Sequence, residues 1–318
     1  MNKIKTRQEG IIKMAKPLVS VITPCFNGER FVDRYFQSIL EQTYDNIELI
    51  FINDGSEDKT EEIALSYSEK LKNKGVKFIY EYQKNEGQAA ALNRGLKLFT
   101  GEYLTCPDSD DVMTPDCIAK KVDFLESHKE YDMVRSNGSY YDMKTGVTKR
   151  ICDAEKASDE NILKDILLLK TYGCCGCYMI TKKVLEKAYP DRNIMVSRVG
   201  QNWQLLVPAA SYSKCGYIDE DLYIVYEHND SHSRSIQSFS KQIERWNGFT
   251  DILLDAIDRS DCDREYYKKL VLENRARNQF YYAIPIKDKQ LIKDKYKDLK
   301  KYGKATLKET LLYLKNII

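Results

Sequence analysis

The chain has 318 residues, and its 50 lysine and arginine residues nearly balance its 48 aspartate and glutamate residues. With 42% hydrophobic residues it can bury a sizeable core, which excludes an intrinsically disordered or low-complexity protein. The near-neutral charge argues against a dedicated nucleic-acid binder. A mean hydropathy of −0.54, without any apolar run of about 20 residues, argues against a membrane-spanning protein.

The first 110 residues alternate between strand and helix patterns, which predicts βαβ units and a parallel sheet. Strands are expected in short runs of β-branched and apolar residues, at 18–23, 47–52, 76–82 and 102–106. Helices are expected where apolar residues recur at helical spacing, at 31–40, 58–71 and 87–99. The ligand crevice of such a sheet lies beyond the carboxyl ends of its strands.

The middle of the chain is more mixed, and the end is helical. Helices are predicted at 115–128, 157–170 and 200–210. Strands are predicted as a hairpin over 131–149, with its turn at 144–146, and at 174–180 and 222–228. We therefore divide the chain into an N-terminal extension (1–16), an α/β domain (17–233) and a C-terminal helical region (234–318) that packs on the core.

Nine cysteines occur in a sequence whose first 16 residues lack the apolar segment of a secretory signal. Reduced thiols in a cytosolic protein are therefore expected rather than a disulfide framework. Cys174 and Cys177 form a C-x-x-C pattern, but no second pair supplies the further ligands that a zinc site needs. We interpret this cluster as small buried residues on a core strand.

Three carboxylates, those of Asp108, Asp110 and Asp111, follow directly on the fourth predicted strand. Carboxylates this close repel one another unless a cation neutralises them, and oxygen ligands suit Mg²⁺ or Mn²⁺ rather than zinc. A bound diphosphate would be a natural further ligand. The alternative is an Asp-rich cap on the helix that begins near Pro115.

A second polar turn, at residues 53–56, follows the second predicted strand. Asp54 would lie at the carboxyl end of that strand, where it can accept a hydrogen bond from a nucleobase or a ribose hydroxyl. The same residues can also form an ordinary Asp-Gly turn, and residues 85–88 a turn and helix start. No glycine-rich dinucleotide motif and no P-loop motif is found in the sequence.

Taken in chain order, these motifs resemble those of family 2 glycosyltransferases. The matching residues are Pro24, Asn27 and Glu29, then 53–56, then Asn85, Gly87, Asn93 and Gly95, then 108–111 and Pro115. The resemblance covers roughly residues 17–232. It implies a GT-A fold, which is a Rossmann-like α/β architecture with a mostly parallel sheet and helices on both faces. It also implies a nucleotide-diphosphate sugar as donor.

The same resemblance implies a role for individual residues. The donor pocket would be lined by Thr23, Pro24, Asn27, Glu29, Asp54, Lys84, Gly87, Gln88, Asn93, Asp108 and Ser109. Asp108 would face the ribose, and Asp110 would hold the Mn²⁺ or Mg²⁺ ion.

One departure concerns the general base. Many family members carry a Glu-Asp pair at the start of the helix below the acceptor site, and its Asp deprotonates the acceptor hydroxyl. Here the corresponding residues, 200–204, are Gly-Gln-Asn-Trp-Gln, and amides do not take up a proton as carboxylates do. Asn202 and Gln204 occupy the position of the base. Three explanations stay open: another carboxylate, such as Asp191 or Asp111, serves as the base; the acceptor needs little deprotonation in a loose transition state; or activity is weak or absent.

Further residues are assigned to the acceptor and to the leaving diphosphate. Gln201 and Trp203 would face the acceptor, although Trp203 could equally be a core residue. His232 and Arg234 lie in a segment that in the resembled family closes over the diphosphate. His232 would complete the metal shell and Arg234 would bind the donor, unless the segment is simply a polar loop.

Residues 287–315 contain ten lysines against four acidic residues, with leucines and isoleucines at helical spacing. A basic amphipathic helix can lie on an anionic membrane surface. The alternative is a solvated helix face packed on its own domain.

Together with the resemblance, these features predict a metal-dependent hexosyl- or N-acetylhexosaminyltransferase; inversion at the anomeric carbon is implied by the resemblance alone. The enzyme would move a sugar, most readily from a UDP-linked donor, to a glycan or lipid-linked acceptor in surface-polysaccharide synthesis. We expect a cytoplasmic protein, peripheral at the inner face of the membrane, without a nucleic-acid partner. One alternative is a non-catalytic nucleotide-sugar- or glycan-binding subunit that lacks a base. Another is a nucleotidyltransferase, although residues 24–30 are not its glycine-rich phosphate loop.

Overall fold

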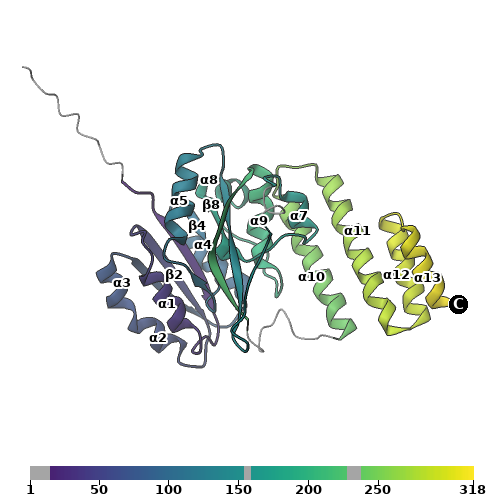
Figure 1. The fold of residues 1–318 in the computed structure, drawn as a ribbon, viewed down its shortest axis with the longest axis horizontal. Coiled ribbons are helices and arrows are strands. Elements are labelled where there is room, and N and C mark those ends of the chain that lie inside the picture. The colour runs from purple at the N-terminus through teal and green to yellow at the C-terminus, as the bar shows by residue number, and fades with distance from the viewer. Residues whose placement is uncertain (1–14, 154–158, 228–237) are drawn as a thin grey trace, which may run out of the picture.

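The computed structural model describes residues 15–153, 159–227 and 238–318 (Figure 1). The strands of the described residues are β1 (Val19–Cys25), β2 (Ile47–Asp54), β3 (Lys77–Gln83), β4 (Tyr103–Thr105), β5 (Val112–Met113), β6 (Met133–Asp142), β7 (Thr148–Arg150), β8 (Tyr178–Thr181) and β9 (Cys215–Glu227). They form one mixed sheet in the order β3-β2-β1-β4-β8-β6-β9-β5, with β7 paired to β6.

Helices surround this sheet and then continue beyond it. The helices of the described residues are α1 (Val32–Leu40), α2 (Thr60–Ser66), α3 (Ser68–Lys74), α4 (Gln88–Leu98), α5 (Cys117–Ser127), α7 (Leu163–Leu167), η1 (Cys175–Cys177), α8 (Lys182–Ala188), α9 (Gln201–Tyr212), α10 (Phe239–Asp258), α11 (Arg264–Ala283), η2 (Ile284–Ile286), α12 (Lys289–Tyr302) and α13 (Leu307–Ile317).

The N-terminal half forms the predicted parallel βαβ units. Strands β3, β2, β1 and β4 are parallel neighbours, and β1 and β2 are buried along their whole length, as continuous apolar strands between two helical layers should be. The connections from β1 to β2 and from β2 to β3 move along the sheet towards the β3 edge, and the connection through α4 crosses back from β3 to β4 on the other side of β1. Because such crossovers are right-handed, α1 to α3 and α4 cover opposite faces of the sheet. The predicted α/β fold is confirmed.

Two predicted elements differ in detail. The helix expected at 58–71 is broken into α2 and α3 at Tyr67, whose ring stacks on Phe36 with 5.0 Å between centroids and whose hydroxyl donates to Asp33. The strand expected at 174–180 is shorter, because residues 175–177 form the 3₁₀ turn η1 before β8 begins. In this turn the backbone of Gly176 packs directly against the ring of Tyr223, where an added Cβ would lie 2.1 Å from the ring.

Other differences lie in the second half of the chain. Strand β9 begins at Cys215, earlier than the predicted 222, and it also pairs with the short strand β5. Of the helix expected at 157–170, residues 163–167 form α7, and residues 154–158 lie outside the described residues. Among the residues that the structure describes, no helix is both long enough and apolar enough to cross a membrane.

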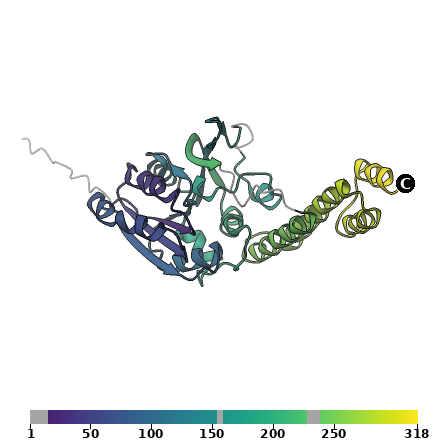
Figure 2. The same cartoon turned by 90° about the horizontal axis from the view of Figure 1, so that it is seen from below.

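The C-terminal helices extend away from the sheet, with α12 and α13 at the far end of the molecule (Figures 1 and 2). Helix α10 nevertheless shares the main core, to which it contributes Ile252, Leu253, Ala256 and Ile257. A second apolar cluster joins the end of α11 to α12 and α13. The expected boundary near 233 falls outside the described residues, and the core itself continues beyond it into α10.

Candidate active site

The turns that follow β1 and β2 are bound to each other at the carboxyl edge of the sheet. The backbone N–H of Asn27 donates to Ser56 Oγ (2.9 Å), and Asn27 Oδ1 accepts from the N–H of Glu57 (2.9 Å). The N–H of Gly28 donates to Thr60 Oγ1 (2.7 Å). Because β1 and β2 are parallel neighbours, their ends coincide, and side chains about 30 residues apart in sequence close this corner of the site.

Three other residues predicted to line the sugar-donor pocket, at the end of β1 and in the turn after it, differ in exposure. Glu29 is exposed, and its carboxylate accepts from the N–H of Lys59 (3.1 Å). Pro24 is buried in β1. Thr23 is fully buried, its hydroxyl lies 2.6 Å from that of Tyr35, and it donates to the carbonyl of Pro107 (3.1 Å). Thr23 therefore fixes the segment that leads into Asp108 rather than facing the crevice.

Asp54 holds the next turn in place. Its Oδ1 accepts from Gln83 Nε2 (2.7 Å) and from the N–H of Glu86 (3.0 Å), while Oδ2 accepts from the N–H of Gly87 (2.9 Å). The carboxylate is buried and meets only donors, so it shapes the turn from which α4 starts. Lys84 lies exposed in the same turn.

Asp108 connects this turn to the acidic cluster. Its Oδ1 accepts from Gln88 Nε2 (3.0 Å), and its N–H donates to the hydroxyl of Tyr223 (3.0 Å). Asp111 is buried, and its Oδ1 accepts from the N–H of Tyr226 (3.0 Å). Strand β9 thus supports the whole acidic turn from behind.

Arg34 of α1 is the cation that lies beside this cluster. Its Nη2 donates to the carbonyl of Asp110 (2.7 Å), and its guanidinium lies 3.5 Å from the ring centre of Tyr226. Ser109, between the acids, lies beside the buried thiol of Cys25. The sequence analysis missed Arg34, because nothing in a helix of mixed pattern marks one arginine as facing a turn 76 residues later.

The acidic cluster carries more negative charge than its surroundings favour. Burial, and then repulsion from Asp110, raises the pKa of Asp108 to about 7. Burial likewise raises the pKa of Asp111 well above its usual range, with further repulsion from Asp110 and Asp108. The folded chain therefore favours a proton or a cation at this position.

The segment between α8 and α9 is fixed by two buried amides. Asn93 donates to the carbonyl of Ile194 (2.9 Å) and accepts from its N–H (2.7 Å). Gln204 does the same with Met195, at 2.9 and 2.8 Å. Both amides were predicted site residues, and the structure places both of them as supports for this segment, with their side chains fully engaged.

This segment between α8 and α9 places Arg198 against the turn that Asp54 holds, at Gly87. A Cβ added to Gly87 would lie 3.6 Å from Arg198 Cδ and 3.7 Å from Cζ, so the arginine lies across this glycine at the start of α4. Its side chain is exposed, and its guanidinium makes no hydrogen bond or ion pair with a described residue. No local pattern predicts this contact, since the two residues are 111 positions apart in the sequence.

The start of α9 is the expected acceptor side. Asn202 Nδ2 donates to the carbonyl of Gly173 (3.1 Å), and the indole of Trp203 packs so closely on Gly173 that an added Cβ would lie 2.5 Å from it. Gln201 is partly exposed beside them. Asn202, at the position where the sequence analysis looks for a base, is thus an amide whose N–H₂ group is engaged with the backbone.

Asp191 is not brought to this site. It is exposed, 3.8 Å from Arg259 Nη1, and its neighbour Arg192 donates to the carbonyl of Phe99 at the C-terminal end of α4. Gln88, which contacts Asp108, lies at the opposite end of that helix. His232 and Arg234 lie outside the described residues.

Gly176→Ala should disturb the acidic turn from a distance. The new Cβ would lie 2.1 Å from Tyr223 Cε2, so the ring that supports the backbone of Asp108 must move. We expect a loss of about 1–3 kcal/mol in the free energy of unfolding, measured by urea denaturation. Tyr223→Phe, which keeps the ring and removes only the hydroxyl, should cost about 1 kcal/mol. Wild-type stability of Gly176→Ala would contradict this packing.

Comparison with known proteins places this site in a family. The model of the family described as "Glycosyl transferase family 2" matches residues 20–189, more than half of the chain. An uncharacterized glycosyltransferase of Rickettsia typhi is 29% identical over 238 residues, covering 73% of this chain and 71% of that protein. Of other curated glycosyltransferases that match, the chain spans as little as 18% and up to 56%.

Two solved structures share the fold at low sequence identity. Staphylococcus aureus TarS (residues 1–349), in complex with UDP-GlcNAc, has a TM-score of 0.62 and 18% identity, over 94% of this chain and 79% of that one. The mannosyltransferase PcManGT of Pyrobaculum calidifontis, in complex with GDP-Man and Mn²⁺, has a TM-score of 0.57 and 16% identity, over 95% and 80%. The family's model ends beyond β8 and includes all the turns that converge on Asp108, so this chain belongs to glycosyl transferase family 2.

Proposed function

We propose that this glycosyltransferase is a metal-dependent, inverting enzyme that moves one sugar from a nucleotide-diphosphate donor, with UDP as the carrier, to an acceptor hydroxyl. The observation that carries this is the convergence of the turns after β1, β2 and β4, with the turn held by Asp54 linked to Asp108 through Gln88. The bound UDP-GlcNAc of the TarS structure supports the donor class, because that protein shares this fold.

The acidic cluster fits a divalent cation. Its ligands are carboxylate oxygens, which Mg²⁺ and Mn²⁺ prefer, and the raised pKa of Asp108 reflects repulsion that a cation would relieve. Among the described residues no three acidic, cysteine or histidine side chains form a cage, which suits an ion that takes most of its ligands from a diphosphate. We assign Asp110 to the ion, which when bound would offset charge on the departing diphosphate. The Mn²⁺ of the PcManGT structure supports this.

Arg198 is the described residue that we assign to the donor phosphates. Its exposed guanidinium has no described partner and lies across Gly87, next to the turn held by Asp54. A planar guanidinium can bind phosphate oxygens in a bidentate manner. We expect Arg234, which lies outside the described residues, to act on the same group.

Asn202 is assigned to the acceptor hydroxyl. Its Nδ2 donates to the carbonyl of Gly173, and this bond fixes the orientation of the amide. The oxygen Oδ1 is the acceptor of the side chain. This oxygen can accept a hydrogen bond from the acceptor hydroxyl and orient it, without taking up the proton. Transfer with little deprotonation in a loose transition state is consistent with that chemistry.

We assign the acceptor to a glycan or a lipid-linked carrier in surface-polysaccharide synthesis. Such an acceptor would be met at the inner face of the membrane, and the lysine-rich residues 287–315 would hold the enzyme there.

A thermal-shift series with UDP, GDP, CDP and dTDP, each with and without Mn²⁺, tests the donor class. A ligand at about 100 times its Kd stabilises the native state by about 2.7 kcal/mol, so UDP with Mn²⁺ should raise Tm by several degrees. Asp110→Ala should abolish the metal-dependent part, and Asp116→Ala, at an exposed acid nearby, should keep it. No shift with any nucleotide would contradict the proposal.

A second measurement separates transfer from binding alone. Release of UDP from UDP-sugars in the presence of Mn²⁺ should be detectable even without an acceptor, as slow hydrolysis. Binding of UDP without release from any UDP-sugar, with and without glycan acceptors, would instead favour a binding subunit that lacks a base.

A further inference from the structure

The helices α11, α12 and α13 form a separate layer around their own apolar cluster. Phe280, Ile292, Tyr296 and Leu299 are buried there, and Tyr296 stacks on Tyr313 of α13 with 4.0 Å between ring centroids. This layer lies at the end of the molecule opposite α2 and α3 (Figure 1). On one side of α13 several aliphatic side chains are exposed.

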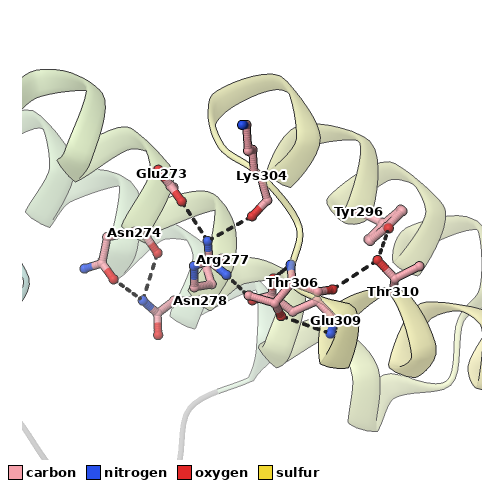
Figure 3. A network of polar contacts seen from close by, with 9 residues as sticks. All are labelled: Glu273, Asn274, Arg277, Asn278, Tyr296, Lys304, Thr306, Glu309 and Thr310. Carbon is pink, nitrogen blue, oxygen red and sulfur yellow. Dashed lines mark hydrogen bonds and ion pairs between the residues drawn. The ribbon is translucent and has the colours of Figure 1, made fainter. Parts of the chain in front are cut away.

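A polar network fixes how α13 is turned (Figure 3). Arg277 of α11 pairs with the buried carboxylate of Glu309 and with Glu273 (2.7 Å), and it donates to the carbonyl of Lys304 (3.3 Å). Glu309 also accepts from the N–H of Thr306 (2.7 Å) in a capping box. The inward face of α13 is therefore held by charge, caps and rings, and the opposite face is defined with it.

That opposite face is apolar. Four aliphatic side chains at i, i+4, i+7 and i+11 form it, and their exposed fractions are 77% for Leu307, 57% for Leu311, 41% for Leu314 and 92% for Ile318. We call these residues the α13 stripe. The α13 stripe is not needed to pack α13 on its neighbours, because Leu312, Tyr313 and Ile317 on the other side of the helix do this. An exposed aliphatic stripe of this kind marks a surface that binds a partner or a membrane.

A cleft of about 470 Å³ lies at the turn from α12 to α13. Four lysines line it, namely Lys269, Lys300, Lys301 and Lys304. None of their ammonium groups makes a hydrogen bond or ion pair with a described residue. The single acid of the cleft, Glu273, is already paired with Arg277, so the cleft keeps an excess of positive charge.

Gly303 makes the cleft turn tight. A Cβ added there would lie 2.4 Å from Glu273 Cδ, so the end of α12 lies directly against the Glu273 side chain of α11. The approach gathers the lysines of two helices and one turn on one concave surface, where an anion can meet several ammonium groups at once.

Two observations favour a membrane over a second copy of this chain. Residues 287–315 carry ten lysines against four acids, so two copies meeting through this surface would repel each other. The α13 stripe is also one face of a single 11-residue helix, whereas a stable protein interface buries roughly 1,200 Å² or more and normally draws on several elements. An anionic bilayer offers both an apolar layer and phosphates.

We propose that the α13 stripe and the lysine cleft, which lie three residues apart in the chain at Leu307 and Lys304, together bind anionic phospholipid membranes. The stripe would enter the headgroup boundary, and the cleft would receive a lipid phosphate. Aliphatic side chains in the interface and lysines beside it are the two components of peripheral membrane binding. This assignment rests on the proposed function in one respect, the membrane contact of residues 287–315, for which it names the ligand and the residues. Its test is separate from that of sugar transfer, because vesicle binding is measured without a donor.

Co-sedimentation of the full chain with vesicles tests this. We expect binding to phosphatidylcholine vesicles that contain phosphatidylglycerol, weak binding to phosphatidylcholine alone, and a loss as salt rises. Leu307→Ser/Leu311→Ser/Leu314→Ser should reduce the partition coefficient at least about tenfold. Leu65→Ser, at a leucine of α2 that is 44% exposed, is the matched control and should bind like wild type.

A charge series tests the cleft. Lys300→Gln/Lys301→Gln/Lys304→Gln should lower binding to the anionic vesicles by about tenfold to a hundredfold, given the usual contribution of a lysine near such a surface. Lys72→Gln/Lys74→Gln/Lys97→Gln removes the same charge from the catalytic domain and should have little effect. All these positions are exposed, and circular dichroism should confirm that each variant folds.

Several outcomes would overturn the assignment. These are no binding to anionic vesicles at low salt, equal binding to neutral ones, or wild-type binding by both triple variants. Complete competition by millimolar-scale inorganic phosphate or glycerol phosphate would reassign the cleft to a soluble phosphate compound. Concentration-dependent self-association that the leucine variant abolishes would reassign the α13 stripe to a second copy.

Discussion

Asp108→Asn is expected to yield a more stable protein that transfers sugar poorly. The charged carboxylate is disfavoured by burial and by Asp110, which raises its pKa to about 7, and asparagine removes that charge while its Oδ1 still accepts from Gln88. At pH 8 we expect the free energy of unfolding of the metal-free protein to rise by about 1–3 kcal/mol. If Asp108 faces the donor ribose, as the family resemblance implies, loss of a charged hydrogen bond of about 1.5–3 kcal/mol should lower kcat/KM about tenfold to a hundredfold.

The gain in stability should depend on pH in a defined direction. Because the pKa of Asp108 is raised on folding, the native state binds the extra proton between about pH 4 and pH 7, and its stability falls as pH rises through that range. The advantage of Asp108→Asn should thus be complete above pH 7 and shrink as pH is lowered towards 4. Urea denaturation at several pH values measures it. Asp251→Asn, at an exposed acid of α10, is the control and should be neutral at every pH.

A divalent cation should replace the effect of the substitution. If Mn²⁺ relieves the same repulsion, it should stabilise wild type at pH 8 and lose effect as protons compete at lower pH. An Asp108→Asn protein that is no more stable than wild type at pH 8 would show that the cluster is not under repulsion.

Asp54→Asn is expected to destabilise the fold and to weaken donor binding together. The carboxylate of Asp54 meets three donors, Gln83 Nε2 and the N–H groups of Glu86 and Gly87. An asparagine amide would turn its own N–H₂ towards a backbone donor, and this leaves a buried N–H unpaired. We expect a loss of about 1–3 kcal/mol in the free energy of unfolding. The turn that carries Gly87 and places Gln88 against Asp108 should loosen, so the nucleotide-dependent rise in Tm should also shrink.

Asp33→Asn is the matched control for this substitution. Asp33 is exposed and accepts from the hydroxyl of Tyr67 (2.7 Å), a bond that an asparagine oxygen can equally accept. It should therefore leave both stability and nucleotide binding near wild type. If Asp54→Asn behaved like Asp33→Asn, the donors around Asp54 would not depend on its charge.

The apolar residues of the C-terminal helices show how tertiary structure changes the interpretation of a sequence pattern. The sequence predicts one basic amphipathic stretch over 287–315, but the structure folds it into two helices. Ile292 and Leu299 then become core residues, while Leu307 and Leu311 stay exposed. Spacing alone could not separate them, because both sets have helical periodicity and only the packing of α12 against α11 decides which face is covered.

The parallel half of the sheet and the order of the polar turns along it can be predicted from the sequence alone, because strand and helix periods and turn residues are local properties. Asp54 and Asp108 are therefore predicted at one edge of the sheet, as the structure has them. Which side chains support these turns depends on tertiary packing. Arg34, Tyr223 and Arg198 reach the site from α1, β9 and the segment before α9, and Asn93 and Gln204 serve as clamps for that segment. Apart from Gln204, whose partner Met195 is nine positions away, these residues contact partners 76 to 115 positions away in the sequence. Such contacts depend on how the layers pack, which no local period encodes.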